Sequence, residues 1–188
     1  MIELSRRFDF VLHGGTAVWR IYGGKRFSYD VDVYLAKPED VLRFLSDAGW
    51  AELTKRRITG TGRAFFRMEN RVPVELEISP PPEGLRPVEG DFWLTDGTSM
   101  VVKTLSPEDL LREKVDAFID RRKARDLYDI YYLLDFCERE RIMDSLGKLL
   151  PLLESPPGDF AVLRELVLVG RAPDFDAIRF KVRAYAED

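Results

Sequence analysis

Two aspartates one residue apart, Asp30 and Asp32, are the residues of this sequence best suited to chemistry. Successive side chains of a strand alternate between its two faces, so both carboxylates point the same way if residues 29–35 form a strand. Val31 and Val33 then face the opposite side and can enter a core. Two carboxylates on an accessible face are suitable oxygen ligands for a divalent cation.

A glycine-rich turn precedes these acids. Gly14 and Gly15 lie between a predicted short apolar strand at residues 8–12 and a predicted helix at 16–22 that begins with Thr16. Glycine allows a ligand to approach the backbone closely, and the free N–H groups at the start of a helix attract anions. We expect these N–H groups and the Thr16 hydroxyl to bind phosphates. A phosphate site beside a metal site is what phosphoryl or nucleotidyl transfer requires.

Two glutamates on a later strand are candidates for a third carboxylate. Apolar and polar residues alternate over residues 72–79, so Glu75 and Glu77 share the polar face. The alternative is that both are solvated side chains on an edge strand. The other predicted elements of the front half are a helix from Pro38 to before Gly49, a hairpin of residues 50–57 and 62–68, a loop at 80–84 and a final strand at 100–104.

The back half is predicted to be helical. Ser106 followed by Pro107 and two acids is a strong helix start. Lys114 lies among apolar residues of this helix, so its stem can pack along an apolar face while the ammonium emerges at the surface. The predicted helices cover residues 107–120, 123–138, 142–153, 160–169 and 175–186.

Two blocks carry a resemblance to a known family. The first is residues 12–17 with Arg26, Ser28 and the Asp30-Val31-Asp32 triplet, and the second runs from residues 105–111 through Lys114 to residues 125–129. Together they resemble the AbiEii/AbiGii-type nucleotidyltransferases, a branch of the DNA polymerase β-like superfamily. The resemblance covers about the first three quarters of the chain, and the tail after about residue 141 matches no motif.

The resemblance implies an α+β fold. It predicts a polymerase β-like nucleotidyltransferase core with a mixed sheet flanked by helices, followed by a C-terminal helical region. Residues 1–104 would form the core with the metal and phosphate site. Residues 105–188 would form the helical region that completes the active-site cleft.

The resemblance also implies roles for the acids. A third carboxylate on a strand beside Asp30 and Asp32 would complete a site for Mg²⁺ or Mn²⁺, and Glu77 resembles the family's third acid more than Glu75 does. Glu75 stays open as the alternative ligand. Glu77 would also accept the proton of the attacking hydroxyl.

Further roles follow from the same resemblance. Lys114 would contact the triphosphate or the base, Asp126 would be catalytic, and Ser28 would add a phosphate contact. Asp129 would orient Lys114 or Arg125.

The activity implied is metal-dependent transfer of a nucleoside monophosphate from an NTP to a hydroxyl acceptor, which would be tRNA or a protein. Family members include toxins of toxin–antitoxin and phage-defence pairs, which implies a cognate antitoxin. The alternatives are an inactive nucleotide- or partner-binding protein of the same fold and a metal-dependent phosphohydrolase.

Composition sets limits on these expectations. The chain has 188 residues, 45% of them apolar, and a net charge of −4, so any RNA contact must come from local basic patches. The candidate patches are residues 55–57 with Arg63 and Arg67, and residues 121–125; both have the alternative of being solvated faces. A single cysteine, Cys137, excludes an internal disulfide. Without a membrane-length apolar run or a signal peptide, a cytoplasmic protein is expected, and its oligomeric state is not predicted.

Overall fold

The computed structural model covers the 188-residue chain and divides it into two units. Unit 1 comprises residues 1–17 and 28–105, and unit 2 comprises residues 18–27 and 106–188. The chain therefore changes unit three times, between residues 17 and 18 inside a helix, between residues 27 and 28, and between residues 105 and 106, so that residues 18–27 group with the helical unit. The structure describes all residues except 48, 50, 51, 70, 71 and 188.

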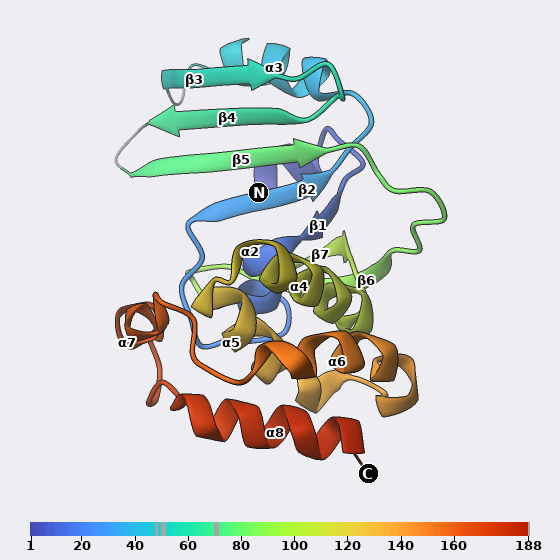
Figure 1. Ribbon diagram of the computed structural model, residues 1–188. Helices are drawn as coiled ribbons and strands as arrows, with labels where there is room; N and C mark the ends of the chain where they lie inside the picture. The colour runs from blue at the N-terminus through green and yellow to red at the C-terminus, as the bar shows by residue number, and fades with distance from the viewer. Residues whose placement is uncertain (48, 50–51, 70–71, 188) are drawn as a thin grey trace. The chain divides into compact units, whose positions relative to one another are not determined.

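Unit 1 is built on one mixed seven-stranded sheet, ordered β3-β4-β5-β2-β1-β7-β6 (Figure 1). β2 runs parallel to β5 and β1 runs parallel to β7, whereas all other neighbours are antiparallel. The strands are β1 (Val11–His13), β2 (Asp30–Tyr34), β3 (Glu52–Ile58), β4 (Ala64–Glu69), β5 (Pro73–Ser79), β6 (Val88–Trp93) and β7 (Ser99–Thr104).

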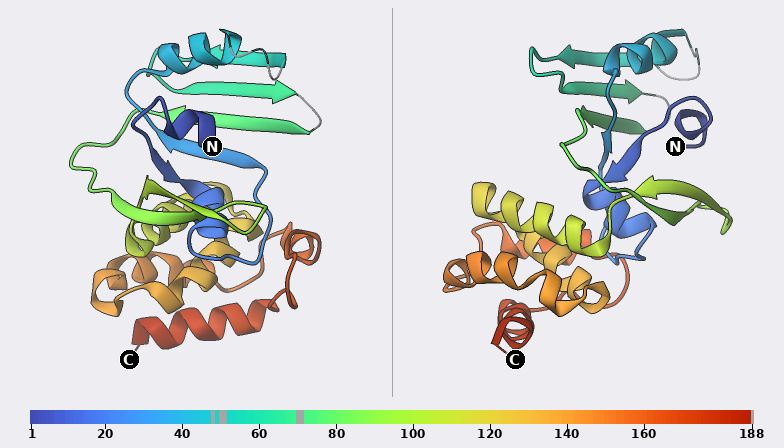
Figure 2. Two further views of the ribbon diagram at one scale, coloured as in Figure 1. Left: turned by 180° about the vertical axis from the view of Figure 1, so that it is seen from behind. Right: turned by 90° about the vertical axis from the view of Figure 1, so that its right-hand side faces the viewer.

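Alternation along the central strands produces one buried apolar face. Val33, Leu76, Ile78 and Phe66 are at most 2% exposed, and along their strands they alternate with residues that face the other side of the sheet. The helices α1 (Ile2–Ser5) and α3 (Pro38–Asp47) lie on this side of the sheet (Figure 2). The core of unit 1 therefore lies on one face, and the carboxylate-bearing positions are left on the other.

Helix α2 (Gly14–Arg20) follows β1 directly, so the glycine turn is the first turn of the helix itself. Gly14 has a φ of +68°, a backbone conformation that residues with a Cβ adopt at a cost. This conformation lets the chain turn abruptly from β1 into α2.

Unit 2 is a set of packed helices. Its α-helices are α4 (Pro107–Arg121), α5 (Ala124–Leu133), α6 (Met143–Leu149), α7 (Leu163–Leu166) and α8 (Phe175–Glu187). Its 3₁₀ helices are η1 (Leu134–Phe136), η2 (Arg139–Arg141), η3 (Leu150–Leu152) and η4 (Phe160–Val162). The Ser106 hydroxyl caps α4 by accepting a hydrogen bond from the Asp109 N–H at 3.1 Å.

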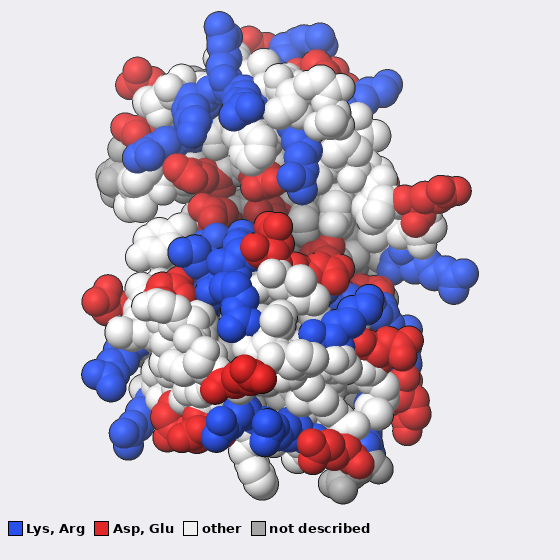
Figure 3. Space-filling view, viewed as in Figure 1, with Lys and Arg blue, Asp and Glu red and all other residues white. Residues whose placement is uncertain are grey.

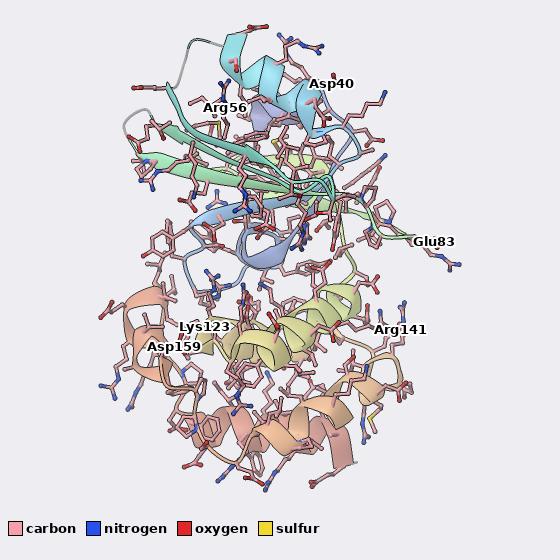
Figure 4. All side chains as sticks on the ribbon, turned by 45° about the horizontal axis from the view of Figure 1, so that its top comes forward. Asp40, Arg56, Glu83, Lys123, Arg141 and Asp159 are labelled. Atoms are coloured by element: carbon pink, nitrogen blue, oxygen red, sulfur yellow. The ribbon has the colours of Figure 1, made fainter. Side chains whose placement is uncertain are left out.

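Two contacts hold the connecting segments of unit 2 in place. Asp159 accepts a hydrogen bond from the Ala124 N–H at the start of α5, and it lies beside Lys123 (Figure 4). Residues 25–27 pair in an extended conformation with residues 166–168, since Phe27 N–H donates to the Leu166 carbonyl and Leu168 N–H to the Lys25 carbonyl. The second pairing explains why residues 18–27 belong to this unit.

The predicted α+β class is confirmed, and the errors are local. The sequence analysis missed β6, and the predicted helix at 160–169 is wrong because only residues 160–166 are helical, as η4 and α7. The predicted helix at 123–138 is α5 followed by η1. Residue 48 of the predicted helix and residues 50 and 51 of the predicted hairpin lie outside the described residues. Within the described residues, no helix has the length and apolar character needed to span a membrane.

Candidate active site

Two rows of side chains cross the face of the unit 1 sheet that lies opposite its apolar core. Residues paired in register on neighbouring strands project to the same side. The first row is Lys55, Arg67, Glu75 and Asp30, on β3, β4, β5 and β2 in turn. The second row is Arg57, Phe65, Glu77, Asp32 and His13, on β3, β4, β5, β2 and β1 in turn.

The rows divide this face into two halves of opposite charge. Asp30, Asp32, Glu75 and Glu77 form the acidic half, on β2 and β5; we call it the acidic face. The space-filling view has Lys and Arg side chains gathered over β3 and β4, and Asp and Glu side chains over the neighbouring β5 and β2 (Figure 3). The register therefore places the four carboxylates that the sequence analysis selected on one face of two neighbouring strands, although their segments are more than forty residues apart in the sequence.

Asp32 lies directly over the glycine turn. A Cβ on Gly14 would come within 2.0 Å of the Asp32 Oδ2 atom, a separation that no real side chain tolerates. Glycine is therefore required here both by the positive φ and by the close approach of the carboxylate. The glycine turn and the aspartate strand are thus one structural unit.

Thr16 connects the same two elements. Its hydroxyl donates a hydrogen bond of 2.5 Å to the backbone carbonyl of Asp30, so that α2 is tied to the start of β2. The predicted hydroxyl contact with phosphate would have to replace this bond. The contribution of Thr16 seen here is to position Asp30.

Glu77 and Glu75 have different surroundings although they are two residues apart. Glu75 is exposed and forms an ion pair with Arg67 at 3.4 Å. Glu77 is half-buried, and its pKa is raised by burial and by the charges of Asp32 and Asp30, which outweigh the opposing charges of Arg63 and His13. Glu77 is therefore the glutamate whose pKa is affected by the charges of the two aspartates.

A cavity of about 230 Å³ opens on this face. It is lined by parts of both rows, with Asp30, Glu75 and Glu77 on one side and Lys55 and Arg67 on the other. Phe65 also lines it. Both signs of charge therefore meet in one hollow within unit 1.

The carboxylates have the right chemistry for a hard cation, but they are not drawn together. Carboxylate oxygens are the ligands that Mg²⁺ and Mn²⁺ prefer, and a cation would relieve the repulsion by Asp32 and Asp30 that, after burial, raises the pKa of Glu77. Within the part of the chain that the structure describes, however, no three His, Cys, Asp or Glu side chains lie close enough to share an ion. The donor set fits the predicted metal, while its side chains must converge to hold it.

Lys114 and Asp126 belong to a charge network in unit 2 that is buried except at Arg121, whose side chain is 40% exposed. The network alternates in sign and consists of Arg26, Asp129, Lys114, Asp126 and Arg121. The Lys114 ammonium is 2.9 Å from Asp129 and 3.8 Å from Asp126, and Arg121 donates two hydrogen bonds to Asp126 at 2.7 and 2.8 Å. Asp129 accepts two hydrogen bonds from Arg26 at 2.5 Å.

Burial alone would raise the pKa of Asp129, but the charges of Lys114 and Arg26 and their hydrogen bonds outweigh it and lower the pKa. Lys114 is only 6% exposed and Asp126 and Asp129 are fully buried. The ion pairs of these two residues are thus with each other and, in addition, with Asp129 for Lys114 and with Arg121 for Asp126.

A family model described as the nucleotidyl transferase AbiEii toxin of type IV toxin–antitoxin systems matches residues 6–155. The match covers well over half of the chain. The chain belongs to the AbiEii family. It is therefore a nucleotidyltransferase, as the resemblance implied.

Solved structures agree with this assignment at the level of the fold. JHP933 from Helicobacter pylori is similar with a TM-score of 0.67 and 23% identity, over 99% of this chain and 88% of that one. A nucleotidyltransferase-like antigenic protein from Paracoccidioides brasiliensis gives 0.52 and 19%, over 80% and 84%. The antibiotic-resistance factor ANT(2'')-Ia gives 0.51 and 13%, over 75% and 81%. No curated protein sequence matches the chain.

The AbiEii match ends at residue 155, so α7 and α8 lie beyond it. Of the predicted site residues within it, Ser28 is half-buried two positions before Asp30, and its side chain makes no hydrogen bond to the described residues. The sequence analysis did not select Phe65, which pairs with Glu77 across β4 and β5. Its position opposite Glu77 follows from the hairpin register, which residue spacing alone does not fix.

Proposed function

We propose that this AbiEii-family protein transfers a nucleoside monophosphate from an NTP to a hydroxyl group, at the acidic face of unit 1. Asp30, Asp32 and Glu77 are the proposed metal-binding and catalytic carboxylates. The observation that carries the proposal is the parallel pairing of β2 and β5, which sets Asp32 beside Glu77 next to the glycine turn.

We propose Mg²⁺ or Mn²⁺ as the cofactor. A bound divalent ion would neutralise phosphate oxygens and stabilise the charge that develops on the leaving pyrophosphate. The chain's part is to supply oxygen ligands from two adjacent strands. Glu75 is the alternative third ligand, although its ion pair with Arg67 favours Glu77.

The phosphates of the NTP are proposed to bind at the first turn of α2. Gly14, Gly15 and Thr16 would offer backbone N–H groups, and Ser28 would add a hydroxyl. Because the Thr16 hydroxyl already donates to Asp30, the backbone N–H is its expected contribution.

In the proposed reaction, an acceptor oxygen forms a bond to the α-phosphorus while the bond from that phosphorus to the β-phosphate oxygen breaks. The pyrophosphate leaves, and the acceptor's proton passes to Glu77. A carboxylate with a raised pKa is a better proton acceptor than an ordinary one, which supports this role for Glu77.

The acceptor is proposed to be tRNA or a protein, and the protein partner a cognate antitoxin, as expected for the toxin of a type IV pair. NTPs are abundant in the cytoplasm, where we propose that the enzyme acts. Lys114 and Asp126 remain predicted for nucleotide contact and catalysis, and the predicted closure of a cleft by residues 105–188 remains a prediction.

The test is a transfer assay with each α-labelled NTP, Mg²⁺ or Mn²⁺, total tRNA and cellular protein. Wild type is expected to attach label to an acceptor, and Asp32→Asn is expected to lose about 10³-fold in rate, which corresponds to about 4 kcal/mol. Glu89→Gln, an exposed carboxylate on β6, is the matched control and should transfer normally.

Other outcomes contradict the proposal. Release of free phosphate without labelled acceptor would indicate a phosphohydrolase. Binding of NTP without turnover under any metal or acceptor would indicate an inactive binding protein.

A further inference from the structure

Strand β6 forms an open edge of the unit 1 sheet. It stands last in the strand order, and within the described residues β7 is the only strand that pairs with it (Figure 1). The pairing is regular from Val88 to Trp93, without a register shift. A regular edge strand presents a row of backbone groups with which a strand of another chain can pair.

The hydrogen bonds of the hairpin determine which backbone groups of β6 point outward. The Leu94 N–H donates to the Thr98 carbonyl at 2.8 Å, and these two residues continue the register of β6 and β7. In an antiparallel ladder, hydrogen-bonded pairs alternate with pairs that do not bond. The even-numbered residues of β6 therefore bond to β7, whereas the N–H and C=O groups of Glu89, Asp91 and Trp93 point away from it.

The side chains of the same three residues lie on one face of the hairpin. All three are exposed, and they form no hydrogen bond or ion pair within the part of the chain that the structure describes. Trp93 is 50% exposed, and Val101 of β7, which pairs with Asp91, is 62% exposed. Glu89 also lines a cavity of about 230 Å³ together with Asp9. The edge thus presents two carboxylates beside exposed apolar side chains.

These carboxylates select the kind of strand that can be added. If two copies of β6 paired antiparallel, Asp91 would lie opposite Asp91 or Glu89 of the other copy, and like charges directly opposite each other destabilise a strand pair. Lysine or arginine at those positions would stabilise it. Strand β3 of a second copy is cationic, but its pairing with β4 shifts register between Leu53 and Lys55, and such a shift bends a strand and makes it a poor partner at its edge.

We infer that the β6 edge binds an extended segment of a partner protein in which lysine or arginine alternates with apolar residues. The backbone of this segment bonds to the outward N–H and C=O groups of residues 89, 91 and 93, and its basic side chains lie opposite Glu89 and Asp91. Its apolar side chains lie on the other face, beside Val88, which is 40% exposed. Strands β7 and β1 separate β6 from the acid-bearing strands, so the inference does not depend on the proposed transfer.

The test is the binding of a fluorescein-labelled peptide of about nine residues that alternates lysine with valine, measured by fluorescence anisotropy. Asp91→Pro is expected to weaken binding at least about 10-fold, because it removes an outward N–H and places a ring against the added strand. The ladder with β7 does not use this N–H, so the hairpin should persist. Asp91→Asn keeps the N–H and removes the charge, so it should weaken binding about 3-fold and reduce its dependence on salt.

The matched control places a proline on the other edge of the sheet. The Thr59 N–H donates to the Arg63 carbonyl at 2.7 Å, so by the same alternation the N–H of Arg56 on β3 points outward. Arg56→Pro is expected to bind the peptide within about 2-fold of wild type, because the peptide pairs with β6. Circular dichroism of each variant checks that it is folded.

Two control peptides separate strand addition from attraction between opposite charges. The first has glutamate in place of lysine, and the second has the same composition as the test peptide but groups its lysines and valines in separate blocks. Neither is expected to bind at concentrations up to about 1 mM. Equal binding of the block peptide and the alternating peptide would overturn the inference, since it would show that charge alone attracts the peptide.

Amide hydrogen exchange in wild type locates the peptide without any substitution. The alternating peptide is expected to slow exchange of the amides of residues 89, 91 and 93 at least about 10-fold, and to leave that of Arg56 unchanged. Slower exchange at these three amides supports the inference even if Asp91→Pro does not fold. Their exchange unchanged by the peptide would overturn it.

Three further outcomes overturn the inference. Wild type does not bind the alternating peptide below about 1 mM, or Asp91→Pro and Arg56→Pro lose affinity equally. The third is self-association of wild type without peptide that Asp91→Pro abolishes, which would make a second copy of this chain the occupant of the edge. None of these measurements involves an NTP, so they leave the proposed transfer to its own assay.

Discussion

The acidic face of unit 1 and the buried network of unit 2 are both clusters of charged side chains, but they are arranged in opposite ways. On the acidic face, like charges are neighbours in register, and Glu77 responds with a raised pKa caused first by burial and then by Asp32 and Asp30. In the network, charges alternate in sign, and Asp129 has a lowered pKa although it is fully buried.

The two arrangements of charge indicate different roles, ligand binding for the acidic face and stabilisation of the fold for the network. A cluster of like charges is unfavourable for the fold by itself, so its presence indicates that a ligand of opposite charge completes it. A cluster of alternating charges is complete without a ligand, and it stabilises the conformation that its members hold. We therefore expect changes on the acidic face to affect activity more than stability, and a change at Asp129 of the network to do the reverse.

The largest expected effect is that of Asp129→Asn on stability. The substitution leaves the buried cations Arg26 and Lys114 without their shared carboxylate, and removing one partner of a buried ion pair costs about 3–5 kcal/mol. The measurement is the free energy of unfolding in urea. Asp135→Asn, which removes a 60%-exposed partner of Lys181, is the control and should cost less than about 1 kcal/mol. Equal small losses in the two variants would contradict the distinction between the regions.

Gly14→Ala is expected to affect both activity and stability. The positive φ alone costs a residue with a Cβ about 1–2 kcal/mol, and the new Cβ would also displace the Asp32 carboxylate. Gly97→Ala measures the cost of the positive φ alone, because Gly97 also has a positive φ but a Cβ added there would meet open space. Gly14→Ala should lose transfer activity and more stability than Gly97→Ala, which should transfer normally. Matching stability and activity in the two variants would show that Asp32 does not depend on the glycine turn.

The network also predicts how stability depends on pH. Because the pKa of Asp129 is lower in the folded chain than its unfolded value near 4, its contribution to stability is fully present above about pH 4. That contribution is lost as the pH falls through the lowered value of the folded state. Free energies of unfolding measured from pH 7 down to pH 3 should fall less steeply at the acid end in Asp129→Asn than in wild type. Identical slopes would mean that Asp129 does not contribute to acid unfolding.

The smallest effect is expected at the edge of the acidic face. Arg67 forms ion pairs with Glu69 and Glu75, but all three side chains are at least 40% exposed. Exposed pairs contribute about 0.2–1 kcal/mol, so Arg67→Gln should lower the free energy of unfolding by no more than that. A loss comparable to that of Asp129→Asn would show that the acidic face also stabilises the fold.

The acid-bearing strands could be predicted from the sequence because alternation is a local signal. Because every second side chain of a strand points to the same face, Asp30 and Asp32 were predicted to share one face of their strand, and Glu75 and Glu77 one face of theirs. The strand register confirms both predictions. The start of the helix at Pro107 could be predicted for the same reason, since the signal consists of adjacent residues that form its cap and first turn.

Contacts between residues far apart in the sequence could not be predicted from local patterns. Arg26 and Asp129 are 103 residues apart, and nothing in either segment indicates the other as its partner. The sequence analysis left Lys114 and Arg125 open as the residue that Asp129 orients, and the structure has the Lys114 ammonium 2.9 Å from Asp129. β6 was not predicted because its glycine and acidic residues weaken the strand pattern. The helix predicted at 160–169 ends early because residues 166–168 pair with residues 25–27 instead.

The most direct test of the acidic face is Mn²⁺ binding, followed by electron paramagnetic resonance with a non-hydrolysable NTP analogue present. Wild type and Glu75→Gln are expected to bind Mn²⁺, whereas Asp32→Asn and Glu77→Gln are expected to lose at least about 10-fold in affinity. Binding by Asp32→Asn and Glu77→Gln equal to that of wild type would contradict the assignment of these carboxylates to a metal site.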